Sequence, residues 1–178
     1  RRGVTVETIL LTHGHIDHAG GAAALREALV KQAGDAVAIP IVGPDARDRF
    51  LLESLEQQGR AYGLTGARDV LPDRWLQEGD QVTIGGHAFA VLHCPGHTPG
   101  HVVFVSEAGR FAIIGDVLFQ GSIGRTDFAY GDHAALIRSI REKLFPLGDD
   151  IAFVCGHGPG STFGAERRGN PFVGERAR

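Results

Sequence analysis

Residues 8–20 read TILLTHGHIDHAG, a short apolar run followed directly by a cluster of polar side chains. The apolar run predicts a short buried strand at residues 8–11. Four potential metal ligands then fall within six residues, namely His13, His15, Asp17 and His18. In an extended segment, residues i and i+2 face the same way, so His13 and His15 are expected to reach one metal ion. Asp17 and His18 lie where the chain turns into a helix, from which they are expected to face a second ion nearby.

Three further candidate ligands, His97, Asp116 and His157, follow apolar segments farther along the chain. A glycine directly precedes each of them, and glycine lets the backbone bend so that side chains from separate loops converge. Imidazole and carboxylate groups are suitable ligands for zinc, iron or manganese. Buried polar groups need partners, and chance rarely supplies them for three histidines and an aspartate at one strand end. The cluster therefore predicts a metal centre rather than a set of structural histidines.

The first third of the chain alternates predicted helices and strands. A helix is expected at residues 20–32, which are strong helix formers, with Gly34 as its end. A short strand is expected at residues 38–42, at an edge or an irregular position because it contains a proline. A second helix is expected over residues 44–58, opened by a proline and ended by Gly59. Its buried face is expected to carry Phe50, Leu51 and Leu55.

The rest of the chain reads as hairpins and one long helix. Alternating apolar residues on both sides of two consecutive glycines predict a hairpin at residues 82–91. A second hairpin is expected at residues 102–114, and a strand is expected at residues 151–154. Apolar residues at helical spacing predict a helix at residues 133–144. Strands with helices between them predict a mixed fold, α/β or α+β, in which helices cover sheets.

Length and composition indicate one globular domain covering residues 1–178. The content of 43% apolar and 22% charged residues is ordinary for such a domain. The formal net charge of −3 argues against nucleic-acid binding, and no apolar run is long enough for a membrane span or reads as a signal peptide. Two cysteines make no disulfide framework, which indicates a reducing, cytoplasmic location. Methionine is absent, so the chain is expected to be a processed product or a fragment.

The cluster at residues 12–21 resembles the metal-binding motif of the metallo-β-lactamase superfamily. Together with residues 93–101, 115–127 and 154–157, it looks like the glyoxalase II (hydroxyacylglutathione hydrolase) branch, and most like its short, single-domain members. The resemblance implies the superfamily's four-layer αββα sandwich, without the C-terminal helical domain of the longer glyoxalase II enzymes. It also implies that the first strands of the family's sheet are missing, so that the domain is N-terminally incomplete.

The resemblance also assigns roles to the candidate residues. It implies two divalent metal ions, with zinc as the first expectation and iron or manganese as alternatives. His13, His15 and His97 would hold the first metal, Asp17, His18 and His157 would hold the second, and Asp116 would bridge them. Asp17 would also be catalytic, because it would orient the attacking hydroxide through a hydrogen bond. β-Lactamases of the superfamily often carry cysteine at the position of Asp116, so this aspartate speaks against that activity.

Arg125 stands where the long glyoxalase II enzymes have a lysine that contacts glutathione, so it is the expected substrate-binding residue. The neighbouring tyrosines of those enzymes correspond to Asp127 and Pro159 in this chain. The sequence therefore keeps a positive charge that complements a substrate carboxylate, and lacks the aromatic contacts.

The function implied is hydrolysis of a thioester, most closely a hydroxyacylglutathione such as S-lactoylglutathione, by attack of a metal-bound hydroxide on the carbonyl carbon. Two alternatives stay open. Residues 124–128 read GRTDF and look like the corresponding loop of persulfide dioxygenases, which use one iron held by two histidines and an aspartate. A chain without the family's first strands is alternatively a truncated, non-catalytic metal-binding fragment. The expected partner is a small-molecule thioester, with neither nucleic acid nor membrane, and the oligomeric state is left open.

Overall fold

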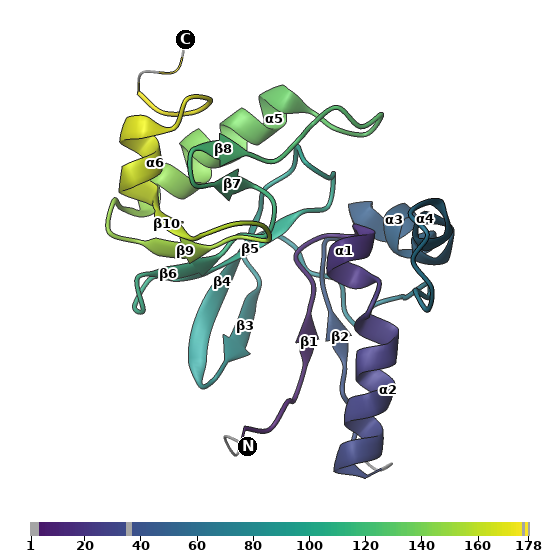
Figure 1. Cartoon of the computed structure of the whole chain (residues 1–178). Coiled ribbons are helices and arrows are strands. Elements are labelled where there is room, and N and C mark those ends of the chain that lie inside the picture. Colours follow the sequence, from purple (N-terminus) through teal and green to yellow (C-terminus); the bar gives the residue numbers. More distant parts are fainter. Residues whose placement is uncertain (1–3, 35–36, 176, 178) are drawn as a thin grey trace. The chain divides into compact units, whose positions relative to one another are not determined.

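The strand predicted at residues 8–11 forms β1 (Ile9–Leu10) in the computed structural model, which describes residues 4–34, 37–175 and 177 (Figure 1). β1 pairs in parallel with β2 (Ile41–Val42). Helix α2 (Ala22–Ala33) supplies the crossover between them, because parallel neighbours cannot be joined by a tight turn. This β-α-β frame belongs to the first of two compact units, residues 1–76 and 77–178. That the chain is a single domain stays a prediction of the sequence.

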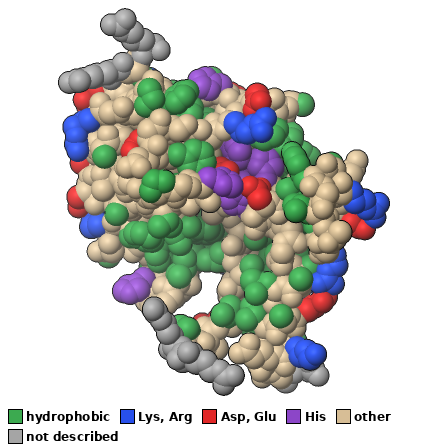
Figure 2. All heavy atoms as spheres, in the orientation of Figure 1, with side chains coloured by type: hydrophobic (Ala, Val, Ile, Leu, Met, Phe, Trp, Pro, Cys, Tyr) green, Lys and Arg blue, Asp and Glu red, His purple; other side chains and the backbone are tan. Residues whose placement is uncertain are grey.

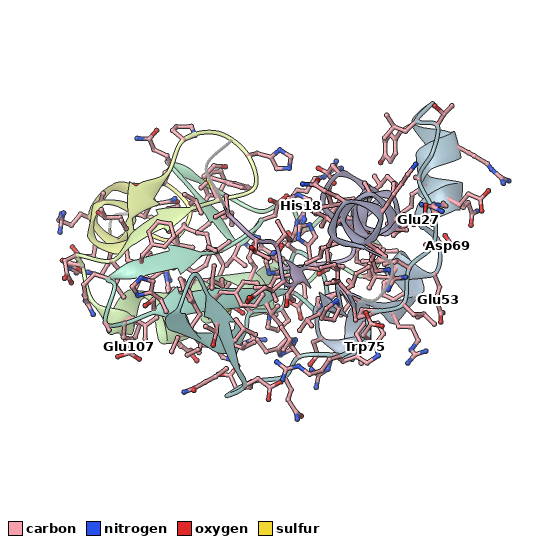
Figure 3. All side chains as sticks on the ribbon, turned by 90° about the horizontal axis from the view of Figure 1, so that it is seen from below. His18, Glu27, Glu53, Asp69, Trp75 and Glu107 are labelled. Carbon is pink, nitrogen blue, oxygen red and sulfur yellow. The ribbon has the colours of Figure 1, made fainter. Side chains whose placement is uncertain are left out.

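The core of the first unit forms where the strand pair meets its helices. Ile41, Leu52 and Leu55 are fully buried in this core. Trp75, labelled in Figure 3, packs against it, and the guanidinium carbon of Arg49 lies 5.2 Å from the centre of the Trp75 ring system. The other helical segments of the unit are α1 (Ile16–Ala19), the 3₁₀ turn η1 (Ala46–Asp48), α3 (Arg49–Leu52) and α4 (Leu55–Ala61).

The single helix expected over residues 44–58 is wrong, because the segment forms η1, α3 and α4 in succession. The interruption falls at Ser54, between α3 and α4. The Ser54 hydroxyl shares its one proton between the backbone carbonyl oxygens of Phe50 and Leu51, at 2.8 and 3.1 Å. Such side-chain bonds compete with the helical hydrogen bonds of the backbone and favour a break.

Two further expectations about this segment are also wrong. Phe50 is 45% exposed, so it does not share a buried face with Leu51 and Leu55. Gly59 does not end a helix, because it lies inside α4. A Cβ atom at Gly59 would lie 2.9 Å from Cβ of Ala67, so close packing explains the glycine. Gly34, in contrast, ends α2 with a positive φ of 98°, as the sequence predicts.

The second unit is built on a six-stranded sheet with the order β10-β9-β6-β5-β4-β3. Strands β3 to β6 are antiparallel neighbours, whereas β6 and β9 are parallel. Strands β4, β6 and β9 therefore run in the same direction, and their C-terminal ends reach the same edge of the sheet. The six strands are β3 (Gln81–Ile84), β4 (His87–His93), β5 (Val102–Ser106), β6 (Phe111–Ile113), β9 (Ala152–Val154) and β10 (Ser161–Thr162).

Both predicted hairpins and the last predicted strand are confirmed by these pairings. Gly85 and Gly86 connect β3 to β4 with φ values of 57° and 82°. A two-residue hairpin turn with positive φ at both positions favours glycine, because a Cβ atom is strained there. The local pattern of the sequence was therefore sufficient to predict this part of the sheet.

The predicted helix at residues 133–144 forms α5 (His133–Arg138) and a π-helical continuation, η2 (Ser139–Leu144). Its side chains Leu136, Ile140 and Leu144 are fully buried in the core of the second unit. The remaining elements are β7 (Leu118–Phe119), β8 (Ser122–Ile123), η3 (Phe145–Leu147) and α6 (Phe163–Gly169). The mixed fold class predicted from the sequence is confirmed. No helix within the described residues has the length and apolar character that crossing a membrane requires.

Candidate metal centre

In the first unit, the predicted ligands lie on the extended segment after β1 and on the short helix that follows it. Helix α1 begins at Ile16, so Asp17 and His18 belong to its first turn. The ring centroid of His13 lies 4.9 Å from that of His15 and 4.1 Å from that of His18. Nε2 of His18 lies 3.5 Å from Oδ2 of Asp17. The structure therefore brings the imidazoles of this segment together and sets the carboxylate beside one of them.

A buried carboxylate that the sequence reading did not single out holds this segment in place. Oδ2 of Asp48 accepts a hydrogen bond of 2.9 Å from the backbone N–H of Gly14. Gly14 also lies close to α3, because a Cβ atom there would be 2.7 Å from Cβ of Leu51. Glycine at this position therefore permits a close approach between the ligand segment and the helix. Nothing in the sequence near Asp48 indicated a partner 34 residues away.

In the second unit, three predicted ligands emerge from the same edge of the sheet. His97 follows β4, Asp116 follows β6 and His157 follows β9, and these strands run in the same direction. Oδ2 of Asp116 lies 3.6 Å from Nε2 of His97 and 3.3 Å from Nε2 of His157. One carboxylate therefore lies within reach of two imidazoles. The side chain of His157 is 57% exposed, and Figure 2 shows histidine side chains at the molecular surface.

The protonation of His97 follows from its hydrogen bond. Nδ1 of His97 lies 2.8 Å from the backbone carbonyl oxygen of Arg125, which only accepts, so Nδ1 carries the proton. In the neutral ring, Nε2 then keeps its lone pair, and this is the atom near Asp116. Histidines that bind metals commonly donate their other N–H to a carbonyl or carboxylate in this way. His97 is therefore prepared to act as a ligand through Nε2.

The loop that carries His97 is fixed against α5 and η2. The Ser139 hydroxyl donates to the carbonyl oxygen of Pro95 at 2.9 Å, and the carbonyl oxygen of Gly96 accepts from the N–H of Asp132 at 2.8 Å. Gly96 has a φ of 137°, and a Cβ atom there would lie 2.4 Å from the backbone nitrogen of Leu136. A side chain is therefore excluded at Gly96, which presses the loop onto the helix.

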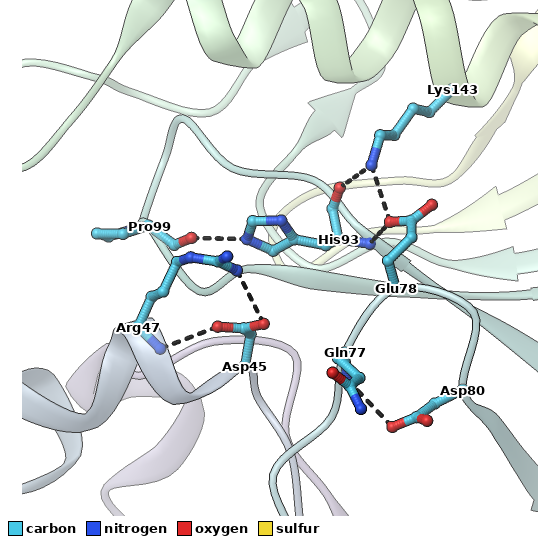
Figure 4. A network of polar contacts seen from close by, with 8 residues as sticks. All are labelled: Asp45, Arg47, Gln77, Glu78, Asp80, His93, Pro99 and Lys143. Carbon is cyan, nitrogen blue, oxygen red and sulfur yellow. Dashed lines mark hydrogen bonds and ion pairs between the residues drawn. The ribbon is translucent and has the colours of Figure 1, made fainter.

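A charged network supports the start of the same loop (Figure 4). Nζ of Lys143 donates to Oε2 of Glu78 at 2.8 Å and to the carbonyl oxygen of His93 at 2.7 Å. The N–H of His93 donates to the same Glu78 oxygen at 2.6 Å, and the His93 ring bonds to the carbonyl oxygen of Pro99 at 2.7 Å. These bonds connect η2 to the end of β4 and to the loop beyond it.

The backbone of Asp116 is held from three sides. Its N–H donates to Nε2 of His101 at 3.0 Å, and its neighbour Gly115 accepts a hydrogen bond of 2.9 Å from the N–H of Gly156. Gly124 lies against its carbonyl group, because a Cβ atom at Gly124 would lie 1.9 Å from the carbonyl oxygen of Asp116. These contacts restrict the backbone of Asp116 and so limit how far its carboxylate can move.

The predicted substrate-binding residue, Arg125, lies on an exposed loop of the second unit. Its side chain is 63% exposed and forms a two-point ion pair with Asp127, at 2.7 and 2.8 Å. This guanidinium holds the pKa of the Asp127 carboxyl below its usual range. The guanidinium carbon also lies 4.6 Å from the ring centroid of Phe128, which stacks on Tyr130 at 5.2 Å. The ion pair and the Phe128 ring therefore hold the Arg125 side chain in one conformation, beside an aromatic surface that was not predicted from the sequence.

Among the described residues, neither cysteine belongs to a group of side chains placed to hold a metal ion. Cys94 is fully buried, and its burial raises the pKa of the thiol to about 12. Burial also raises the pKa of the Cys155 thiol. Imidazole nitrogens and carboxylate oxygens therefore make up the candidate ligands, and these donors suit zinc, iron or manganese.

Comparison with known sequences supports the family resemblance. The profile of the metallo-beta-lactamase superfamily matches residues 1–157. The chain is 46% identical over 175 residues to the hydroxyacylglutathione hydrolase GloC of Haemophilus influenzae, and the match covers 98% of this chain and 79% of that protein.

Solved structures agree with the sequence comparison. TTHA1623, crystallised in a di-iron-bound form, has a TM-score of 0.79 and 42% identity, covering 93% of this chain and 77% of that one. The B3 metallo-beta-lactamase BLEG-1 has a TM-score of 0.80 and 38% identity, covering 96% and 78%. The predicted fold family is thereby confirmed: the chain belongs to the metallo-β-lactamase superfamily of metallo-hydrolases.

Proposed function

We propose that this chain is a binuclear metal-dependent hydrolase of thioesters, with a hydroxyacylglutathione such as S-lactoylglutathione as its substrate. The observation that carries the proposal is the placement of Asp116, whose carboxylate oxygen lies 3.3 and 3.6 Å from the Nε2 atoms of His157 and His97. A carboxylate that reaches imidazoles from two different loops is suited to bridge two cations. The identity with GloC supports the acyl-glutathione as substrate.

The ligand set that we propose is the one that the family resemblance implies. His13, His15 and His97 would hold one metal, Asp17, His18 and His157 would hold the other, and Asp116 would be shared by both. When bound, the metals supply a water of lowered pKa and a Lewis acid that polarises the thioester carbonyl. The protein holds the imidazole of His97 in one tautomer through the carbonyl group of Arg125.

Asp17 has a second role in this proposal. Its side chain is 50% exposed and lies at the start of α1, beside His18. From this position its carboxylate accepts a hydrogen bond from the attacking water and orients the water toward the carbonyl carbon. The leaving thiolate is stable without a proton, so the reaction needs no dedicated general acid. The candidate residues are consistent with this, because most of them are possible metal ligands and none of them is a lysine or a tyrosine.

Removal of the metal tests the proposal directly. We expect chelator-treated protein to lose S-lactoylglutathione hydrolysis by about 100-fold or more, and to regain it with zinc, iron or manganese. Elemental analysis of the active protein should give two metal ions per chain. Hydrolysis that persists in metal-free protein contradicts the proposal.

The same preparation separates the alternatives. One iron per chain, with oxygen uptake on glutathione persulfide, identifies a dioxygenase instead. Hydrolysis of a β-lactam in preference to the thioester identifies the activity that the name of BLEG-1 describes. A chain that hydrolyses no thioester and shows no cooperative thermal transition is a truncated, non-catalytic metal-binding fragment.

Arg125 tests whether the substrate carries a carboxylate. We expect Arg125→Ala to raise KM for S-lactoylglutathione about 5- to 20-fold with little change in kcat, because a charge-assisted hydrogen bond in an exposed position contributes about 1–2 kcal/mol. Hydrolysis of the lactoyl thioester of N-acetylcysteamine, which has no carboxylate, should be unaffected.

The control for this variant is Arg168→Ala, which removes another exposed arginine of the same unit. The Arg168 side chain is 60% exposed and pairs with Asp149 on the surface. Arg168→Ala should leave KM unchanged for both thioesters. If Arg125→Ala weakens both substrates equally, the arginine does not recognise a carboxylate.

A further inference from the structure

His101 is a buried histidine that the proposed ligand set does not use. It lies between the His97 loop and β5, and its exposed fraction is 0%. Its carbonyl oxygen accepts a hydrogen bond of 2.8 Å from the N–H of Cys94, which closes the loop of residues 94–101. Its ring centroid lies 6.1 Å from that of His97. The side chain therefore starts from the loop that carries one proposed ligand.

The same ring reaches a second proposed ligand. Nε2 of His101 lies 3.0 Å from the backbone nitrogen of Asp116, and the bond is buried. A backbone N–H only donates, so Nε2 must accept and the neutral ring carries its proton on Nδ1. The hydrogen bond thus links two segments of chain that are 15 residues apart and that each carry a proposed ligand.

The position of this bond gives it a specific effect on the carboxylate. Asp116 lies just beyond the end of β6, where the neighbouring Gly115 still accepts a hydrogen bond from the N–H of Gly156 and the N–H of Asp116 itself depends on His101 for its acceptor. A buried N–H without an acceptor is costly, so the backbone would rotate to find one. Rotation about the bonds next to Cα would move the carboxylate away from Nε2 of His97 and Nε2 of His157.

We propose that His101 is a positioning residue, which accepts a hydrogen bond from the Asp116 N–H and so fixes the carboxylate for both metals. The inference rests on the proposed function, because it assigns Asp116 as the bridge. His101 itself contacts neither substrate nor metal in this proposal. Its contribution is the acceptor atom at Nε2, not the volume of the ring.

Two near-isosteric substitutions separate the acceptor from the volume. His101→Gln keeps an oxygen acceptor near the place of Nε2, whereas His101→Met fills a similar volume with a poor acceptor. We expect His101→Met to weaken the binding of one metal equivalent by about 10- to 100-fold in a zinc titration of the metal-free protein. His101→Gln should recover most of this loss, and the control His87→Met, on the exposed start of β4, should bind like wild type.

Several outcomes overturn the inference. Equal losses in the Met and Gln variants would show that the ring matters only for packing. If His101→Met binds both metal ions as tightly as wild type does, the hydrogen bond has no effect on metal binding. Wild-type protein that binds no metal would overturn the proposed function as well, whereas the first two results leave that function intact.

A measurement on the wild-type chain covers the case in which both variants fail to fold. In ¹⁵N-labelled protein, we expect Nδ1 of His101 to be protonated and Nε2 to show scalar coupling to the amide nitrogen of Asp116 across the hydrogen bond. A protonated Nε2 would exclude the acceptor role and overturn the inference without reference to activity.

Discussion

Asp116→Asn is expected to lower kcat/KM for S-lactoylglutathione by about 10³-fold, which corresponds to about 4 kcal/mol of transition-state stabilisation. The substitution keeps the shape of the side chain and removes the negative charge that we propose lies between two cations. It can also turn an amide N–H₂ toward the Nε2 atoms of His97 and His157, which lie 3.6 and 3.3 Å from the present carboxylate oxygen. Those lone pairs would then accept hydrogen bonds instead of binding metal.

The stability of this variant gives an independent readout. The Asp116 side chain is 8% exposed, and a buried carboxylate is costly without a compensating cation. The metal-free variant should therefore melt at or above the temperature of metal-free wild type. Added zinc should raise the Tm of wild type and raise that of the variant much less, because stabilisation by a ligand scales with its affinity for the folded state.

The matched control is Asp150→Asn, which makes the same chemical change on an exposed carboxylate of the same unit. Asp150 is 69% exposed and pairs with Arg110. Activity and metal-dependent stabilisation should stay as in wild type. Retention of more than about a tenth of wild-type kcat/KM by Asp116→Asn would contradict a bridging role, since one tenth is a loss of only about 1.4 kcal/mol.

The parts of the fold that the sequence predicted are those set by local pattern. The hairpin at Gly85 and Gly86 combines alternating apolar residues with a turn that needs positive φ, and both signals lie within ten residues. The helix at residues 133–144 has a continuous apolar face, and its extent was predicted correctly. Its π-helical winding was not predicted, because the apolar spacing does not distinguish it from an α-helix.

The errors have a non-local cause. Gly59 was interpreted as a helix end, and only its contact with Ala67 shows that it permits close packing inside α4. Phe50 fits the apolar spacing of a helix, yet the break at Ser54 changes which face is buried. Propensity and spacing describe a segment by itself, and they do not include the neighbours that decide such cases.

In the candidate site, too, local features were predictable from the sequence and contacts between distant residues were not. The spacing of residues 13–18 was enough to predict that their side chains gather, and the structure brings the imidazoles together. The glycine before each of His97, Asp116 and His157 suggested that these residues converge from three separate loops, and the family resemblance supplied their roles. The supporting contacts of Asp48 with Gly14 and of His101 with Asp116 join positions 34 and 15 residues apart. Only the fold reveals such pairs.

Gly124→Ala is expected to destabilise the protein by about 3 kcal/mol or more, at the upper end of what overpacking costs. Its Cβ atom would lie 1.9 Å from the carbonyl oxygen of Asp116 and 3.2 Å from Cβ of His97. The obstacle is backbone, which cannot rotate away as a flexible side chain would. The backbone of Gly124 is not in the left-handed region, so the penalty comes from the steric contact and not from φ. Urea unfolding of the metal-free protein measures this loss.

The control is Gly169→Ala, at the end of α6, where an added Cβ atom meets nothing within 4 Å. This variant should leave the free energy of unfolding unchanged or raise it by up to about 1 kcal/mol, because alanine restricts the unfolded chain more than glycine does. Whatever Gly124→Ala protein still folds must shift the Asp116 backbone, so it should bind fewer than two zinc ions. If Gly124→Ala instead unfolds at the same urea concentration as wild type and binds two zinc ions, the backbone of Asp116 is not held in place by Gly124. A fixed position of its carboxylate would then no longer support a bridging role.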